Sequence, residues 1–141
     1  MAYASHQEMI ERFGEQELIR LTDRDGEAGA IVASVLDRAL ADADAIIDAH
    51  LQSAGYPLPM SGQVDLLTSI AVDLARPRLY DENPTETVLA REKTAMGMLG
   101  RIASGALKLG LPPAETPTTS DEAVIESAGS VWARGSSKGF I

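Results

Sequence analysis

The sequence predicts an all-α fold: a small helical bundle with one long helix. Apolar residues make up 45% of the chain but aromatic residues only 4%, so the core must consist mainly of Leu, Ile, Val, Met and Ala, which favours packed helices. Apolar residues also recur at helical spacing between Gly, Pro and polar breaks. A chain of this length buries roughly 68% of its unfolded surface as one domain. We expect a helical domain over residues 1–111 and an extended C-terminal arm over 112–141.

The first helix is expected at about residues 5–13. Ser5 followed by Glu8 forms the S-x-x-E capping box, which satisfies two backbone donors at a helix start. Gly14 is a typical helix stop. One or two further helical turns follow at 15–21.

These turns, with Phe13, Leu18 and Leu21 as apolar contacts, should cover one end of the long helix. Replacing Phe13 by alanine would cost about 3 to 5 kcal/mol if its ring is fully buried. The polar segment TDRDGE then forms a loop.

The long helix is expected at about residues 28–51, where apolar side chains repeat at helical spacing over some six turns. The expected inward positions are Val32, Val35, Leu36, Ala39, Ala43, Ile46 and His50. Further apolar residues widen this face, so the helix should have neighbours on two sides. Asp37, Asp44 and Asp48 are spaced seven and four apart and therefore stack on one side of the helix. A solvated acidic face is the alternative to any functional role for this row.

A third helix is expected at about residues 63–80, after a Gly- and Pro-containing break at 53–62 whose Tyr56, Leu58 and Met60 point to the core. Pro77 lies within the helix and removes one of its hydrogen bonds. We therefore expect a kink or an early end near residues 73–76.

A fourth helix is expected at about residues 84–105. Asn83 and Pro84 are typical of an N-cap followed by a first helical position, and Met96 should be buried. Gly97 and Gly100 inside this helix each cost about 1 kcal/mol relative to alanine. Close approach of another backbone would compensate for that cost, because glycine has no side chain to hold a neighbour away.

Composition opposes several classes of function. There is no cysteine, and His6 and His50 do not have the spacing of metal ligands, so we expect no metal, no cofactor and no enzymatic activity. The net charge of -9 opposes direct binding to nucleic acid. No basic leader or long apolar stretch is present, so a soluble, cytoplasmic product without a membrane segment is expected.

Five short segments in order resemble the Mu-like phage head-tail connector family, small helical virion proteins long catalogued only as a domain of unknown function. The resemblance covers about residues 3–112. The segments are RFGEQELIRLTD, ALADADAIIDAHL, GYPLP, DLARPRLYD and IASGALKLGLP.

The resemblance implies a head-completion or adaptor protein of the virion, located at the head-tail interface and in the host cytoplasm during assembly. Its partners would be the portal protein, a tail-completion or stopper protein, and itself in a ring of about twelve copies if the ring follows the portal's symmetry. DNA would pass nearby without specific binding. Asp37, Asp44 and Asp48 would then face the lumen and repel the passing DNA.

The C-terminal arm would reach the portal or an adjacent subunit. Its anchors would be Val131, Trp132, Phe140 and Ile141. Aromatic side chains supply much contact area at low entropic cost. A solubilising tail is the alternative for this segment, and a small acidic helical protein-binding module, an inhibitor or adaptor unrelated to virions, is the alternative for the whole chain.

Overall fold

The computed structural model describes residues 2–110, which form five α-helices and no strand, so the predicted all-α fold is confirmed, and the further turns expected at 15–21 form a helix of their own. The helices are α1 (His6–Phe13), α2 (Glu15–Thr22), α3 (Ala33–Ser53), α4 (Asp65–Arg78) and α5 (Glu86–Ala103). The arm at 112–141 lies outside the described residues.

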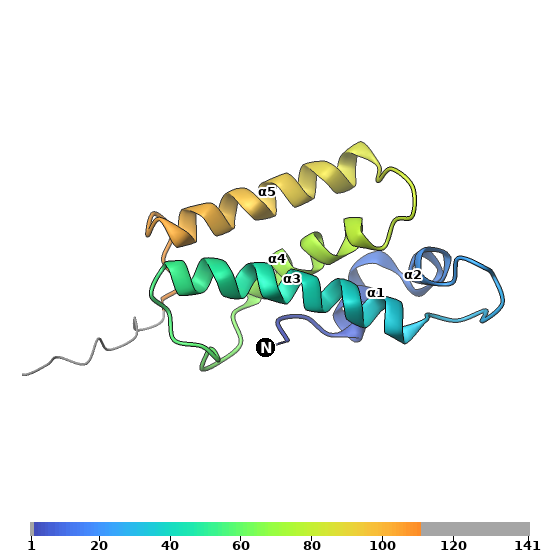
Figure 1. The fold of residues 1–141 in the computed structure, drawn as a ribbon, viewed down its shortest axis with the longest axis horizontal. Coiled ribbons are helices and arrows are strands. Elements are labelled where there is room, and N and C mark those ends of the chain that lie inside the picture. Colours follow the sequence, from blue (N-terminus) through green and yellow to red (C-terminus); the bar gives the residue numbers. More distant parts are fainter. Residues whose placement is uncertain (1, 111–141) are drawn as a thin grey trace, which may run out of the picture.

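Three of the helices form the body of the molecule (Figure 1). α3 and α5 run in the same direction, α4 runs back against both, and each of the three contacts the other two. α1 and α2 pack at the end that holds the first turns of α3. This confirms that the long helix has neighbours on two sides. The largest fully buried side chains are Met9, Leu18, Leu36, Ile47, Leu51, Leu67, Ile70, Val72, Leu74, Leu79, Leu99 and Ile102.

The start and end of α1 are as predicted. The Ser5 hydroxyl accepts a hydrogen bond from the Glu8 backbone N–H at 3.3 Å, and the Ser5 N–H donates to the Glu8 carboxylate at 2.7 Å. Gly14 then adopts a φ of 86°, a left-handed value that favours glycine. This glycine separates α1 from α2 and lets the two short helices fold back on each other.

The apolar contacts of α1 and α2 are only partly as expected. Leu18 is fully buried, whereas Phe13 and Leu21 are half-buried against the core. The Arg76 guanidinium lies 4.3 Å from the centre of the Phe13 ring and also donates to the Glu17 carboxylate at 2.6 Å. Because the Phe13 ring is not fully buried, the loss of about 3 to 5 kcal/mol in stability expected for its replacement by alanine does not apply.

The expected start of α3 at residue 28 is wrong by five residues. Asp23 accepts hydrogen bonds from the backbone N–H groups of Ala28 and Gly29, and the Thr22 hydroxyl accepts one from Val32. Gly29 has a φ of 61°, outside the right-handed helical region. Side chains at the end of α2 thus hold this segment in a loop until Val32.

Two expected core positions are also wrong. His50 is only half-buried on α3, and its ring nitrogen Nδ1 lies 2.7 Å from the Ile46 carbonyl. Met96 on α5 is 38% exposed, because Ala95 and Leu99 form the face that packs on the core. Leu40 on α3 is buried in the core, although the sequence predicts only that it widens the apolar face.

α4 starts at Asp65 and continues through Pro77 to Arg78, so the early end expected at residues 73–76 is wrong, and the alternative of a kink there stays a prediction. Pro77 lies in the last turn, where it removes the one hydrogen bond that its N–H would have donated to the Asp73 carbonyl, and only Arg78 of the helix follows it. The Arg78 guanidinium donates to the Leu74 carbonyl and so supplies a donor in the same turn.

The N-cap of α5 is Thr85 rather than the predicted Asn83. The Thr85 hydroxyl accepts a hydrogen bond from the Val88 N–H at 3.4 Å. Pro84 therefore precedes the cap, and Glu86 is the first helical residue.

The segment between α3 and α4 packs on the core as predicted. Met60 is buried, and Tyr56 and Leu58 are half-buried. The Tyr56 hydroxyl also accepts a hydrogen bond from the Leu109 N–H at 3.2 Å. The last described residues of the chain are thereby held against this segment.

Candidate interaction surfaces

The acidic row on α3 binds the N-terminal segment of the same chain. The Tyr3 N–H donates to Asp44 at 3.1 Å, and the Tyr3 hydroxyl donates to Asp48 at 2.5 Å. The His6 ring nitrogen Nε2 lies 2.6 Å from the Asp37 carboxylate. All three acids therefore lie on one side of α3, as their spacing predicted. The partners were not predicted, because Tyr3 and His6 are 31 to 45 residues away in the sequence.

Burial controls the ionisation of this contact. Burial raises the pKa of Asp44, and the hydrogen bond from the Tyr3 N–H opposes that rise. Burial also raises the pKa of the Tyr3 phenol, and the neighbouring Asp48 carboxylate raises it further. Tyr3 is therefore a neutral hydrogen-bond donor at physiological pH. The acidic row has a structural role within the chain, and its orientation toward a ring lumen stays a prediction.

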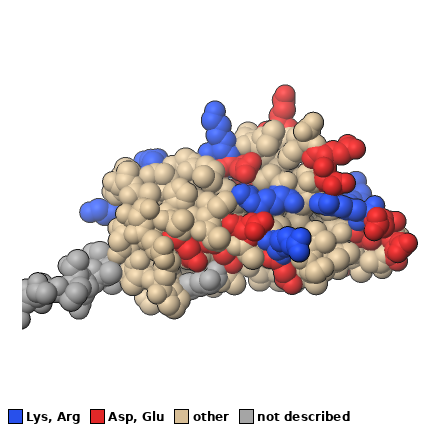
Figure 2. Space-filling view, in the orientation of Figure 1, with Lys and Arg blue, Asp and Glu red and all other residues tan. Residues whose placement is uncertain are grey.

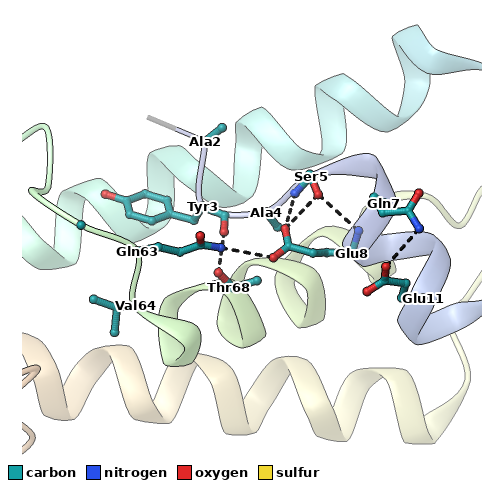
Figure 3. A pocket seen from close by; sticks show the side chains of 11 residues that line it. Ala2, Tyr3, Ala4, Ser5, Gln7, Glu8, Glu11, Gln63, Val64 and Thr68 are labelled. Carbon is teal, nitrogen blue, oxygen red and sulfur yellow. Dashed lines mark hydrogen bonds between the residues drawn. The ribbon is translucent and has the colours of Figure 1, made fainter.

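α4 holds the same segment from the other side. The buried Thr68 hydroxyl donates to the Tyr3 carbonyl at 2.8 Å. Tyr3 and Ala4 are both buried, so the chain before α1 is fixed between α3 and α4. An open cleft of about 490 Å³ lies beside it (Figure 3). The lining residues are Ala2, Tyr3, Ala4, Ser5, Gln7, Glu8, Glu11, Gly62, Gln63, Val64 and Thr68.

The cleft is lined by both apolar and acidic side chains. Glu8 and Glu11 line it from α1, with Gln7 donating to Glu11 at 3.0 Å (Figure 3). Gln63 reaches across from the segment before α4 and donates to Glu8 at 3.5 Å. Within residues 2–110, no group of three or more His, Cys, Asp or Glu side chains is arranged to hold a metal ion. The cleft therefore offers shape and negative charge to a docking partner.

Gly97 and Gly100 lie on the exposed side of α5. A Cβ atom built on either glycine would meet nothing within 4 Å, so the expected close approach of another backbone is not made within the described chain. Leu89 and Met96, which are 45% and 38% exposed, lie on the same helix. A close approach by a second chain stays a prediction.

Charge is distributed unevenly over the molecule. Residues 8–27 hold seven of the 21 acidic residues, whereas residues 49–64 and 94–100 hold no Asp, Glu, Lys or Arg. Charged side chains accordingly gather toward the right of Figure 2, where α1, α2 and the start of α3 lie, and are sparse at the left end. On the face that Figure 2 shows, the described part of the molecule thus has one end rich in charged side chains and one end poor in them.

The remaining predicted site residues, Val131, Trp132, Phe140 and Ile141, lie outside the described residues. Among residues 2–110, no helix is both long enough and apolar enough to cross a membrane.

Comparison with known proteins identifies relatives over the whole chain. A sequence profile of the family described as "Bacteriophage Mu, Gp36" matches residues 3–127, which extends 15 residues beyond the resemblance noted from the short segments. The "Mu-like prophage FluMu protein gp36" of Haemophilus influenzae is 33% identical over 140 residues, covering 99% of this chain and 98% of the relative. "Gene product J" of Escherichia phage Mu is 29% identical over 143 residues, covering 100% of both chains. The chain therefore belongs to the bacteriophage Mu gp36 family.

Proposed function

We propose that this protein is a structural component of a phage virion, a head-tail connector that forms a ring below the portal and links the DNA-filled head to the tail. The end-to-end similarity to gene product J of phage Mu, with equal coverage of both chains, supports a phage protein, and the connector role is what the resemblance of the five short segments implies. Its ring would hold about twelve copies if it follows the portal's rotational symmetry. Its partners would be the portal protein, the tail-completion protein and its own neighbours.

The surface of the molecule supports this proposal. A subunit of a ring needs two different contact surfaces, because head-to-tail contacts join unlike faces. The charge-poor end and the exposed apolar side chains of Leu89 and Met96 on α5 are suited to such contacts, since interface centres are poor in charged residues. The acidic surface elsewhere would repel passing DNA. We propose no catalytic role for any of these residues.

The proposal is tested by mixing the purified full chain with rings of the portal protein encoded by the same phage and measuring the mass by native mass spectrometry. We expect a complex with about a dozen added subunits. A chain that stays monomeric beside the portal at high concentration would contradict the proposal. That outcome would favour a small acidic protein-binding module instead.

A matched pair of variants tests the α5 surface in the same experiment. Met96→Lys replaces an exposed apolar side chain of α5 by a charged one and should reduce the number of added subunits. Ala45→Lys places the same charge on an exposed position of α3 and should leave assembly unchanged. If both variants change the number of added subunits equally, the exposed face of α5 does not take part in the proposed contact.

A further inference from the structure

The cleft beside α1 has the size and character of a docking site for a peptide segment. Its volume of about 490 Å³ lies within the roughly 300–1,000 Å³ that is typical of ligand pockets. Ala4 and Val64 supply apolar lining, and Glu8 and Glu11 supply negative charge. A complementary segment would therefore combine large apolar side chains with basic ones.

The end of this chain has that composition. Residues 127–141 contain Trp132 and Phe140 as large apolar side chains, Arg134 and Lys138 as bases, and no acidic residue. The preceding residues 111–126 have the opposite character. They contain four acids and no base: Glu115, Asp121, Glu122 and Glu126.

The length of the chain permits this segment to reach a neighbouring molecule. The described part ends at Gly110, just after Leu109 donates its N–H to Tyr56. The sixteen residues from 111 to 126 span at most about 3.3–3.6 Å each, or roughly 50–60 Å in total. That length is comparable to the diameter of a small domain or greater.

We propose that the cleft beside α1 receives the terminal segment 127–141 of a neighbouring copy of this chain. This inference rests on the proposed ring, because seating each arm in the next subunit repeats one contact around a closed assembly. Trp132 fills the cleft, and Arg134 and Lys138 lie near the carboxylates of Glu8 and Glu11.

Photo-cross-linking in the full chain tests the proposal. The chain carries benzoylphenylalanine in place of Trp132 and is mixed with ¹⁵N-labelled chain of natural sequence, alone and with portal rings. After irradiation, peptide mass spectrometry locates the cross-links. We expect cross-links between labelled and unlabelled chains that map to residues 2–11 and 62–68. Cross-links confined to one chain, or to any other surface, would overturn the proposal.

Charge variants test the electrostatic part of the proposed contact in the same experiment. Glu11→Lys changes an exposed carboxylate of the cleft and should reduce the yield of cross-links to the cleft by several fold. Glu27→Lys makes the same change on an exposed loop outside the cleft and should leave the yield unchanged. Restoring the yield by combining Glu11→Lys with Lys138→Glu would support direct charge pairing. Equal yields from the Glu11 and Glu27 variants would contradict it.

The outcomes separate this inference from the proposed function. Portal-bound rings without cross-links to the cleft would overturn the docking of the terminal segment and leave the connector proposal standing. Cross-links between copies in the cleft, without any binding to portal rings, would support the docking and contradict the connector proposal.

Discussion

Tyr3 fixes the chain before α1 through three hydrogen bonds to two different helices. Its N–H and hydroxyl donate to Asp44 and Asp48 on α3, and its carbonyl accepts from Thr68 on α4. A carboxylate that loses such a donor in a partly buried site is poorly solvated. The stability of this end of the molecule should therefore depend on single atoms of Tyr3.

Tyr3→Phe removes only the hydroxyl and should lower the free energy of unfolding by about 1–3 kcal/mol, since the bond to a charged acceptor is lost. Chemical denaturation measures the change. Tyr80→Phe, at a half-buried tyrosine after α4, is the matched control and should have a smaller effect. Equal effects would show that the Asp48 contact contributes little.

Asp44→Asn tests the cost of burying a charge. Burial raises the pKa of Asp44 in the folded chain, so the folded state holds this proton to a higher pH than the unfolded state. Asp44 therefore contributes a stability that is present at low pH and is lost as the pH rises through the folded pKa. The asparagine variant, which keeps an acceptor for the Tyr3 N–H, should gain stability relative to the natural chain as the pH rises above 3.8. A stability difference that does not vary between pH 3 and pH 7 would contradict this account.

At the scale of the helices, local patterns predicted which segments are helical but not every boundary. The capping box of α1 and the apolar spacing of α3, α4 and α5 involve residues close in sequence, so they could be recognised directly. The start of α3 could not, because it depends on Thr22 and Asp23 binding backbone groups five to ten residues later. Such side-chain contacts compete with helix formation and leave no periodic signal.

Thr22→Val tests how the loop before α3 is held. The buried Thr22 hydroxyl donates to the Leu18 carbonyl at 2.8 Å and accepts from the Val32 N–H at 3.0 Å. Valine keeps the shape but leaves the Val32 N–H without its acceptor, which should cost about 1–3 kcal/mol. Thr94→Val removes an exposed hydroxyl that donates only to Ala90 within α5, and should change stability by less than about 0.5 kcal/mol. Thermal unfolding of both variants decides between these expectations.

Gly97 and Gly100 are tested by alanine substitution. A Cβ at either position meets nothing within the described chain, so each alanine should stabilise α5 by up to about 1 kcal/mol. If a neighbouring backbone approaches this face in the ring, the same substitutions should weaken assembly on the portal.

Gly105→Ala is the contrasting variant, because Gly105 has a φ of 79° and alanine there should destabilise the fold. If the alanine variants at positions 97 and 100 are more stable and still assemble on the portal as well as the natural chain, close packing of a neighbouring backbone against α5 is excluded.

At the scale of the whole molecule, the sequence predicted a helical domain and an acidic row but not what the row contacts. The row meets the N-terminal segment through residues 31 to 45 positions apart, and the cleft forms where that segment meets α1 and the start of α4. Contacts over such separations depend on the packing of the helices and have no local signature. Gly97 and Gly100 were recognised from the sequence, but only the structure shows that neither has a neighbour within residues 2–110.

Electron microscopy of particles from a phage that lacks this gene tests most directly whether the protein joins heads to tails. Without the protein, the account predicts DNA-filled heads and separate tails in the lysate, and purified protein added to that lysate should restore complete particles. Complete, infectious particles formed in the absence of the protein would contradict the account.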